Sequence, residues 1–217
     1  GFTPRHVMYR YLWPIVILCC LAACQSDLDK KISQLQEVEL SNPEISFSKD
    51  SALSFVAKQV SFGPRVPNLP SHLHCADYLF NKLSSYGLSV KIQEAEVENY
   101  RSDTLHLRNI IAQYNPKHKT RIALISHWDT RPYADREPDL AQQEMLPDGA
   151  NDGGSGTAIM LEIARLTQKA DVDLGIDFLF FDGEETGPPE YDTSYAQTMN
   201  SYCRGSQYYC EHSLLNM

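Results

Sequence analysis

The 217-residue sequence predicts a single α/β domain. Short apolar runs at 121–126 and 175–181 have the length and composition of strands that are buried in a sheet. Between them, segment 155–168 places its apolar residues at helical spacing, so that strands and helices alternate along the chain. The sequence contains no internal repeat and no low-complexity tract, and one domain therefore fits its length.

The first elements are predicted from capping and loop signals. A helix is expected to begin near Ser48, because Ser48 or Ser51 can cap it and apolar residues recur on one face as far as Val60. Segment 61–67 must be a loop, since Gly63 and two prolines interrupt any regular structure.

The following elements are predicted from periodicity. A second helix is expected over 71–86, where Gly87 provides a typical C-terminal cap. Alternating patterns predict strands at 88–97 and 105–114, separated by a polar turn. The two apolar runs described above are then expected to be strands covered on both faces.

The N-terminal region is expected to lie outside this domain. Residues 1–23 resemble a lipoprotein signal peptide, since basic residues precede an apolar run that ends in Leu-Ala-Ala followed by Cys24. Cys24 would then carry a lipid and anchor the protein to a membrane of the cell envelope. An uncleaved signal anchor is the alternative. Residues 24–47 are interpreted as a tether and N-terminal arm, and the domain as 48–217.

The charge of the chain excludes one class of partner. Lys and Arg number 19 against 28 Asp and Glu, which gives a net charge of −9. Nucleic acids attract basic surfaces, so we expect no nucleic-acid partner.

Acidic and imidazole side chains collect just after the predicted buried strands and before the 155–168 helix. They are His127, Asp129, Asp152, Glu184 and Glu185. In open α/β sheets, ligands bind at the carboxyl ends of strands, so these groups are expected to converge. Oxygen and nitrogen donors with a nearby carboxylate to move protons are typical of a catalytic zinc site. For Asp152, a helix cap is the alternative role.

Other polar groups in this region have simpler interpretations. Asp135, Glu137 and Asp139 are expected to lie on a solvated loop, and Arg131 to pair with one of them. Asp182 is expected to be structural and to orient a neighbouring ligand.

The motifs formed by these residues resemble a known family. The chain carries His-x-Asp at 127–129, Asn-Asp-x-x-Ser-Gly at 151–156 and Glu-Glu at 184–185. This pattern resembles the zinc-dependent exopeptidases of metallopeptidase family 28 and, more closely, the glutaminyl-peptide cyclotransferases that share their fold. Further stretches strengthen the resemblance to the cyclotransferases, over roughly residues 48–210: FGPRVPN at 62–68, HWDTRPYADREPD at 127–139, GPPEY at 187–191 and CRGSQYY at 203–209.

The resemblance implies a fold and a set of roles. The fold is a three-layer sandwich with a mixed, mostly parallel central sheet. Asp152 and Glu185 are the implied zinc ligands, and Glu184 is the implied general acid and base. His127 is a ligand only if a second metal is bound. The family's last ligand is a histidine near the C-terminus, beyond Met217, so the chain is expected to be a truncated copy whose fold is incomplete there.

Trp128 and Tyr133 are expected to wall an apolar substrate pocket, with core packing alone as the alternative for Trp128.

Three functions remain open from the sequence. The first is a zinc-dependent glutaminyl cyclase that converts an N-terminal Gln to pyroglutamate and releases ammonia. The second is a zinc aminopeptidase on the same scaffold. The third is an inactive fragment or a remnant that only binds peptides. The expected substrates are peptide or protein N-termini, and a monomer is expected.

Overall fold

The computed structural model describes residues 45–196 and 199–212. Apart from Ile45, these residues belong to one compact unit, Ser46–Met217. The predicted signal peptide, Cys24 and most of the predicted tether lie outside the described residues. Within the described part, no helix has the length and apolar character needed to cross a membrane.

The described chain forms four α-helices, two short 3-10 helices and four strands, close to the predicted positions. The α-helices are α2 (Lys49–Val60), α3 (Pro70–Ser85), α4 (Gly154–Leu166) and α5 (Arg204–Glu211), and the 3-10 helices are η1 (Leu140–Gln142) and η2 (Met199–Ser201). The strands are β1 (Ser89–Glu98), β2 (Thr104–Tyr114), β3 (Arg121–His127) and β4 (Gly175–Phe181). Ser48 caps α2 as predicted, because its hydroxyl accepts the N–H of Ser51 at 3.2 Å.

The four strands form one mixed sheet in the order β1-β2-β4-β3. β1 pairs antiparallel with β2, β2 antiparallel with β4, and β3 parallel with β4. The α/β class and the mixed sheet are confirmed. Among the described strands, however, only one of the three pairings is parallel, so this part of the sheet is less parallel than expected. The β1–β2 hairpin explains one antiparallel pairing, because its short connection permits no other, and the second joins β2 to β4.

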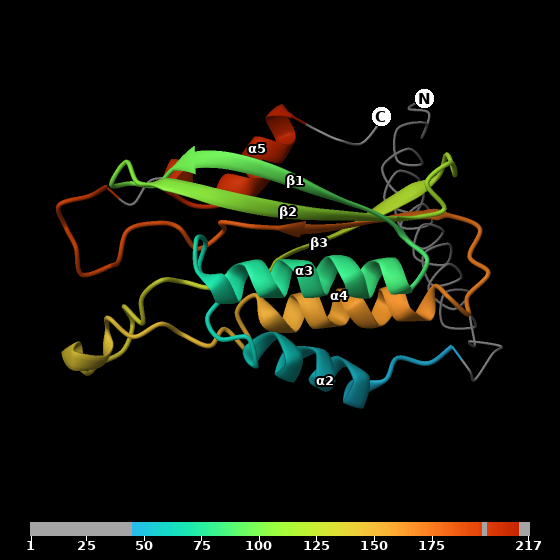
Figure 1. Cartoon of the computed structure of the whole chain (residues 1–217), viewed down its shortest axis with the longest axis horizontal. Helices are drawn as coiled ribbons and strands as arrows, with labels where there is room; N and C mark the ends of the chain where they lie inside the picture. Colours follow the sequence, from blue (N-terminus) through green and yellow to red (C-terminus); the bar gives the residue numbers. More distant parts are fainter. Residues whose placement is uncertain (1–44, 197–198, 213–217) are drawn as a thin grey trace, which may run out of the picture. The chain divides into compact units, whose positions relative to one another are not determined.

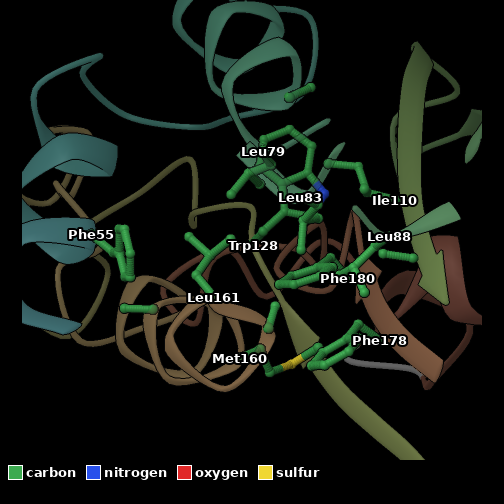
Figure 2. Close-up of a cluster of buried hydrophobic side chains, with 14 of the residues drawn as sticks. Phe55, Leu79, Leu83, Leu88, Ile110, Trp128, Met160, Leu161, Phe178 and Phe180 are labelled. Carbon is green, nitrogen blue, oxygen red and sulfur yellow. The ribbon is translucent and has the colours of Figure 1, made fainter. Parts of the chain in front are cut away.

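Helices cover both faces of the sheet, which gives the three predicted layers (Figure 1). α3 and α4 lie against one face, with α2 packed on α4, and α5 lies against the opposite face. The main core lies between the sheet and α3 and α4. It includes Leu79, Leu161, Phe178 and Phe180, each fully buried (Figure 2). Tyr209 of α5 packs in a smaller cluster on the other face.

The two predicted buried strands differ from each other. β4 is buried over nearly its whole length, as expected for a central strand. β3 is not covered on both faces, which corrects the prediction: Ile122 is 46% exposed and Ile125 is 62% exposed. The physical reason is its position at the edge of the described sheet, where one side of the strand has no neighbouring strand.

Candidate metal and catalytic site

Parallel pairing of β3 and β4 brings two of the predicted motifs together. His127 lies opposite Phe181 in the register, and the N–H of Trp128 donates to the Phe181 carbonyl at 3.0 Å. The segments that follow the two strands therefore leave the same edge of the sheet, as predicted. One contains Asp129 and the other contains the turn 182–185, which we call the acidic turn.

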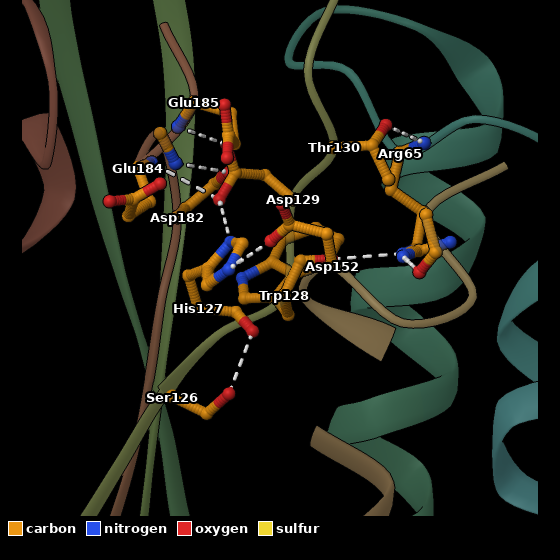
Figure 3. Close-up of polar contacts among 12 residues, drawn as sticks. Arg65, Ser126, His127, Trp128, Asp129, Thr130, Asp152, Asp182, Glu184 and Glu185 are labelled. Atoms are coloured by element: carbon orange, nitrogen blue, oxygen red, sulfur yellow. Dashed lines mark hydrogen bonds and ion pairs between the residues drawn. The ribbon is translucent and has the colours of Figure 1, made fainter. Parts of the chain in front are cut away.

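Asp129 joins these two segments. Its carboxylate has no exposed surface and accepts the backbone N–H groups of Glu184 and Glu185, each at 3.1 Å (Figure 3). Hydrogen bonds from N–H groups to an ionised carboxylate are stronger than those between neutral groups. Asp129 thus fixes the backbone from which the predicted acid and base Glu184 and the predicted ligand Glu185 project.

His127 connects these two segments to the turn at 150–153, which we call the Asp152 turn. Its Nε2 lies 3.0 Å from Asp152 Oδ1, and its Nδ1 lies 3.4 Å from Asp129 Oδ1. Burial alone would lower the pKa of His127, but the carboxylates of Asp129, Glu184 and Asp152 outweigh burial and raise it to about 9. In the absence of a metal, His127 is therefore a cation held between acids.

The Asp152 turn approaches His127 closely because a glycine follows it. A Cβ at Gly153 would lie 2.8 Å from the His127 carbonyl oxygen and 2.9 Å from the imidazole ring. Gly153 also occupies the N-cap position of α4, and no side chain caps this helix. The Asp152 carboxylate, 71% exposed, is therefore not used as a helix cap and remains available to a ligand.

Trp128 differs from the expectation. The indole has no exposed surface, stacks on the His72 ring at a centroid distance of 4.5 Å and donates from Nε1 to the Arg108 carbonyl at 3.1 Å. It packs in the core and presents no surface to a substrate in this structure. Trp128 directly follows β3, and its side chain turns inward to the core.

Asp182, the first residue of the acidic turn, has a structural role, as expected. It is fully buried and its Oδ2 lies 2.7 Å from His72 Nε2, while the N–H groups of Arg108 and Gly183 donate to its two oxygens at 2.6 and 2.8 Å. Burial raises its pKa, and His72 opposes this shift. The carboxylate fixes the start of the turn and has no exposed surface.

The start of α5 holds the acidic turn from the other side. The N–H groups of Cys203, Arg204 and Gly205 donate to the carbonyl oxygens of residues 184, 183 and 182, at 3.0, 2.8 and 3.0 Å. A Cβ at Gly205 would lie 2.2 Å from the Asp182 carbonyl oxygen, so a larger residue there would push the helix away. Cys203 Sγ also lies 3.4 Å from Glu184 Oε1. The CRGSQYY stretch is thus explained as a support for the turn.

Arg65 ties the His127 segment to the loop that precedes Asp152. Its guanidinium is fully buried and donates to the carbonyl oxygens of Trp128, Asp148 and Gly149 at 2.9, 2.9 and 2.7 Å. Its backbone N–H donates to Thr130 Oγ1 at 2.9 Å. The fork of the guanidinium suits several carbonyls at once, which explains the arginine of the FGPRVPN stretch.

Arg131 pairs with two acids near the site. It binds Asp135 through two nitrogens, at 2.7 and 2.5 Å, and its Nη1 lies 3.2 Å from Glu185 Oε2. Asp135 is only 7% exposed, which corrects the prediction that it lies on a solvated loop. Its pairing with Arg131 explains its burial. For Glu185, burial first and then the charges of Glu184 and Asp152 raise the pKa to about 7, although Arg131 opposes this shift.

Tyr133 lies on a cavity that also reaches Asp152. Its hydroxyl is 2.5 Å from that of Tyr100. Its expected role in substrate binding stays a prediction.

The donor types of the site fit zinc, but the described residues do not complete a ligand set. Asp152 and Glu185 offer carboxylate oxygens and His127 offers an imidazole, which are ligands that zinc accepts. Burial and then repulsion by Glu184 and Asp152 raise the pKa of Glu185, and a bound cation would relieve the repulsion. Within residues 45–196 and 199–212, no three His, Cys, Asp or Glu side chains are grouped closely enough to hold a metal ion.

The three-layer fold, with acidic residues after the carboxyl ends of β3 and β4, defines an α/β domain of the zinc-exopeptidase type. Residues 109–216 match peptidase family M28, and this part of the chain is a peptidase M28 domain.

Two solved structures are similar to the chain at the same level. A Zn-dependent exopeptidase from Parabacteroides distasonis is 43% identical with a TM-score of 0.76, over 79% of this chain and 58% of that chain. The glutaminyl cyclase of Bacteroides thetaiotaomicron, solved with N-acetylhistamine, is also 43% identical with a TM-score of 0.76, over 77% of this chain and 57% of that one.

Among curated proteins, aminopeptidase YwaD of Bacillus subtilis is 30% identical over 139 residues, which cover 58% of this chain and 26% of that protein. The chain therefore spans well under two thirds of the length of these relatives.

The acids of the site and the structural role of Asp182 could be predicted from the sequence, but its partner His72, Arg65 and the α5 amides could not. These supports act through contacts between segments far apart in the chain. A buried arginine in a Gly-Pro loop was the one local signal available, because an arginine beside an apolar segment needs several acceptors.

Proposed function

We propose that the chain belongs to a zinc-dependent glutaminyl-peptide cyclotransferase, which converts an N-terminal Gln to pyroglutamate and releases ammonia. The observation that carries this proposal is the acidic turn held by Asp129, in which Glu184 is close enough to Glu185 and His127 to raise the pKa of both. The similarity to the glutaminyl cyclase of Bacteroides thetaiotaomicron supports it.

The roles follow from the side-chain chemistry. Asp152 and Glu185 would hold zinc, with His127 joining them if a second metal is bound. Bound zinc polarises the carbonyl of the γ-carboxamide. Glu184 accepts a proton from the α-amine as its nitrogen bonds to the γ-carbon. Glu184 then returns that proton to the amide nitrogen as its bond to carbon breaks, and ammonia leaves.

An aminopeptidase is the second candidate. The match to peptidase family M28 and the similarity to aminopeptidase YwaD favour it. In that reaction, Glu184 accepts a proton from water as the water oxygen bonds to the peptide carbonyl carbon. Glu184 then protonates the amine that leaves. The same residues therefore serve both reactions, and the attacking group distinguishes them. A remnant that only binds peptides is the third possibility.

The substrates proposed are peptide or protein N-termini, and the proposed location is the cell envelope, with Cys24 as a lipid anchor. We propose a monomer without a nucleic-acid partner, which agrees with the acidic composition.

The first test is the reaction itself. We expect the zinc-loaded chain, incubated with a Gln-initiated peptide, to yield a product that has lost ammonia by mass spectrometry. Release of free Gln would favour the aminopeptidase instead. Unchanged peptide, with stoichiometric zinc bound, would favour the remnant.

The proton-transfer role of Glu184 has a matched control. Glu184→Gln is expected to lower kcat by roughly 10²–10⁴-fold, as for loss of a general acid and base. Glu98→Gln makes the same change at an exposed position of β1 and is expected to leave kcat unchanged. Full activity in Glu184→Gln would contradict the mechanism.

A further inference from the structure

A cavity of about 390 Å³ adjoins the candidate site. It lies between the segments 130–137 and 142–152, and Asp152 is part of its lining. The volume is within the range of about 300–1,000 Å³ that is usual for small-ligand pockets. Because Asp152 borders both the cavity and the predicted metal site, a molecule that reacts at the site can extend directly into the cavity.

Much of the cavity lining is apolar. It includes Met145, Leu146 and Pro147 from one segment and Tyr133 and Ala134 from the other. Met145 is 60% exposed and Leu146 is 42% exposed, although both are large apolar side chains. Exposed apolar side chains that gather in a concave surface next to a reactive site are typical of a ligand-binding pocket.

Two charged groups of the lining pair with each other. Arg131 binds Asp135 through two nitrogens, and this largely buried pair presents little net charge to a ligand. Arg136 of the lining lies 2.8 Å from Glu190 Oε1 at the surface. Glu137 and Asp152 also line the cavity, and the apolar residues 145–147 give it a surface that suits an apolar side chain.

The walls are held in place before any ligand arrives. The N–H of Ala134 donates to the Gln143 carbonyl at 2.9 Å, which ties the two walls together, and Gln143 Nε2 donates to the Glu137 carbonyl at 2.9 Å. The Tyr191 hydroxyl donates to Glu144 Oε1 at 2.5 Å. A pocket with fixed walls loses little entropy on binding and can discriminate between side chains.

We propose that this cavity receives the side chain of the second residue of a peptide substrate and selects large apolar side chains there. The inference rests on the proposed function, because it places the reacting N-terminal residue beside Asp152. It adds a specificity that the proposed reaction does not itself require, since the cyclisation uses only atoms of the first residue.

Turnover of paired peptides tests the selectivity. Gln-Phe and Gln-Ala peptides of equal length are compared by kcat/KM. The wild-type chain is expected to prefer Gln-Phe by roughly 10–100-fold, which is the discrimination an apolar pocket provides. Leu146→Asp, or Met145→Asp as a second variant, is expected to reduce this preference to near parity. Leu140→Asp is the matched control, because Leu140 is 76% exposed on the same loop and does not line the cavity.

A photochemical experiment separates this inference from the proposed function. A Gln-initiated peptide with benzoylphenylalanine at its second position is irradiated with the full chain, and the cross-linked residue is mapped by mass spectrometry. A cross-link at 145–147 supports the inference even without turnover, in which case the proposed reaction alone is overturned. Turnover with no preference, or a cross-link elsewhere, overturns the inference alone. Absence of both turnover and cross-link overturns both.

Discussion

Asp129 shows how a single buried carboxylate organises this site. Its oxygens accept two consecutive backbone N–H groups and it also lies beside His127. Because one side chain links the segments that follow two strands, it positions the predicted ligands of both segments relative to each other. Catalytic side chains held by a supporting layer of hydrogen bonds are typical of precise metal sites.

Glu185 gives the site a measurable pH dependence. Its pKa in the folded chain is about 7, above the ordinary value of about 4.5, because of burial and the charges of Glu184 and Asp152. A raised carboxyl pKa means that the folded state holds the proton more tightly than the unfolded state. The stabilisation is complete below about pH 4.5 and is lost as the pH rises through 7.

We therefore expect Glu185→Gln, which mimics the protonated carboxyl, to gain stability relative to the wild-type metal-free chain as the pH rises from 4.5 to 7.5. Urea denaturation at several pH values measures this difference in the free energy of unfolding. Glu98→Gln controls for the loss of one negative charge from an acidic chain. A Glu185→Gln difference that does not change with pH would show that Glu185 keeps an ordinary pKa.

The elements of the fold were largely predictable from the sequence. The apolar periods of α2, α3 and α4 and the alternation in β1 and β2 are local properties, and they gave boundaries within about two residues. α5 was not predicted as a helix because it is only eight residues long and buries only Gly205 and Tyr209. Its position depends on backbone contacts with the acidic turn, which no local pattern specifies.

The candidate site, like the fold, could be predicted from the sequence only in part. The types of ligand could be read from residues that follow strands, and the parallel register of β3 and β4 explains why that reading placed His127 near Glu184. The predicted burial of β3 was wrong, because an apolar run does not reveal whether a neighbouring strand covers it. For Trp128 the sequence left core packing and a substrate wall open, and the indole packs in the core. The contacts of Arg65 join segments more than 60 residues apart, which sequence spacing cannot specify.

The two edges of the described sheet differ in chemistry. β1 carries the exposed charged residues Lys91, Glu94 and Glu96, which discourage pairing with another chain. β3 exposes Ile122 and Ile125 instead. An exposed apolar edge strand is prone to aggregation, so any aggregation of the monomer at high concentration is expected to begin at β3.

We expect Ile125→Lys to reduce concentration-dependent association, measured by light scattering, while changing the free energy of unfolding by less than about 0.5 kcal/mol. Ile159→Lys is the matched control. Ile159 is 48% exposed but belongs to α4, where no free backbone groups invite pairing. Equal effects of the two substitutions would show that apolar exposure alone, and not the strand edge, drives association.

At the scale of the whole molecule, the acidic composition bears on the proposed location. A chain with a net charge of −9 is repelled by anionic membrane surfaces. Association with a membrane must therefore depend on an anchor, and the proposed anchor is a lipid on Cys24.

Expression of the full chain in a bacterium with a labelled fatty acid tests this proposal. The wild-type protein is expected in the membrane fraction with the label attached, and Cys24→Ser is expected to lose the label. Cys20→Ser changes a cysteine within the apolar run and is expected to keep it. Label retained in Cys24→Ser would rule out this residue as the acceptor.

The support of the acidic turn by α5 also determines when the turn can form during synthesis. The carbonyls of residues 182–184 find their partners only at 203–205, and Asn109 binds both the Asp182 N–H and the Gly205 carbonyl, at 3.0 and 2.8 Å. A nascent chain that ends at Glu185 contains every predicted metal-binding residue of the described part. It lacks the α5 backbone groups that hold the acidic turn. The acidic turn can therefore reach its final form only after residues 203–205 have been synthesised, whereas the strands of the described sheet are complete at Phe181.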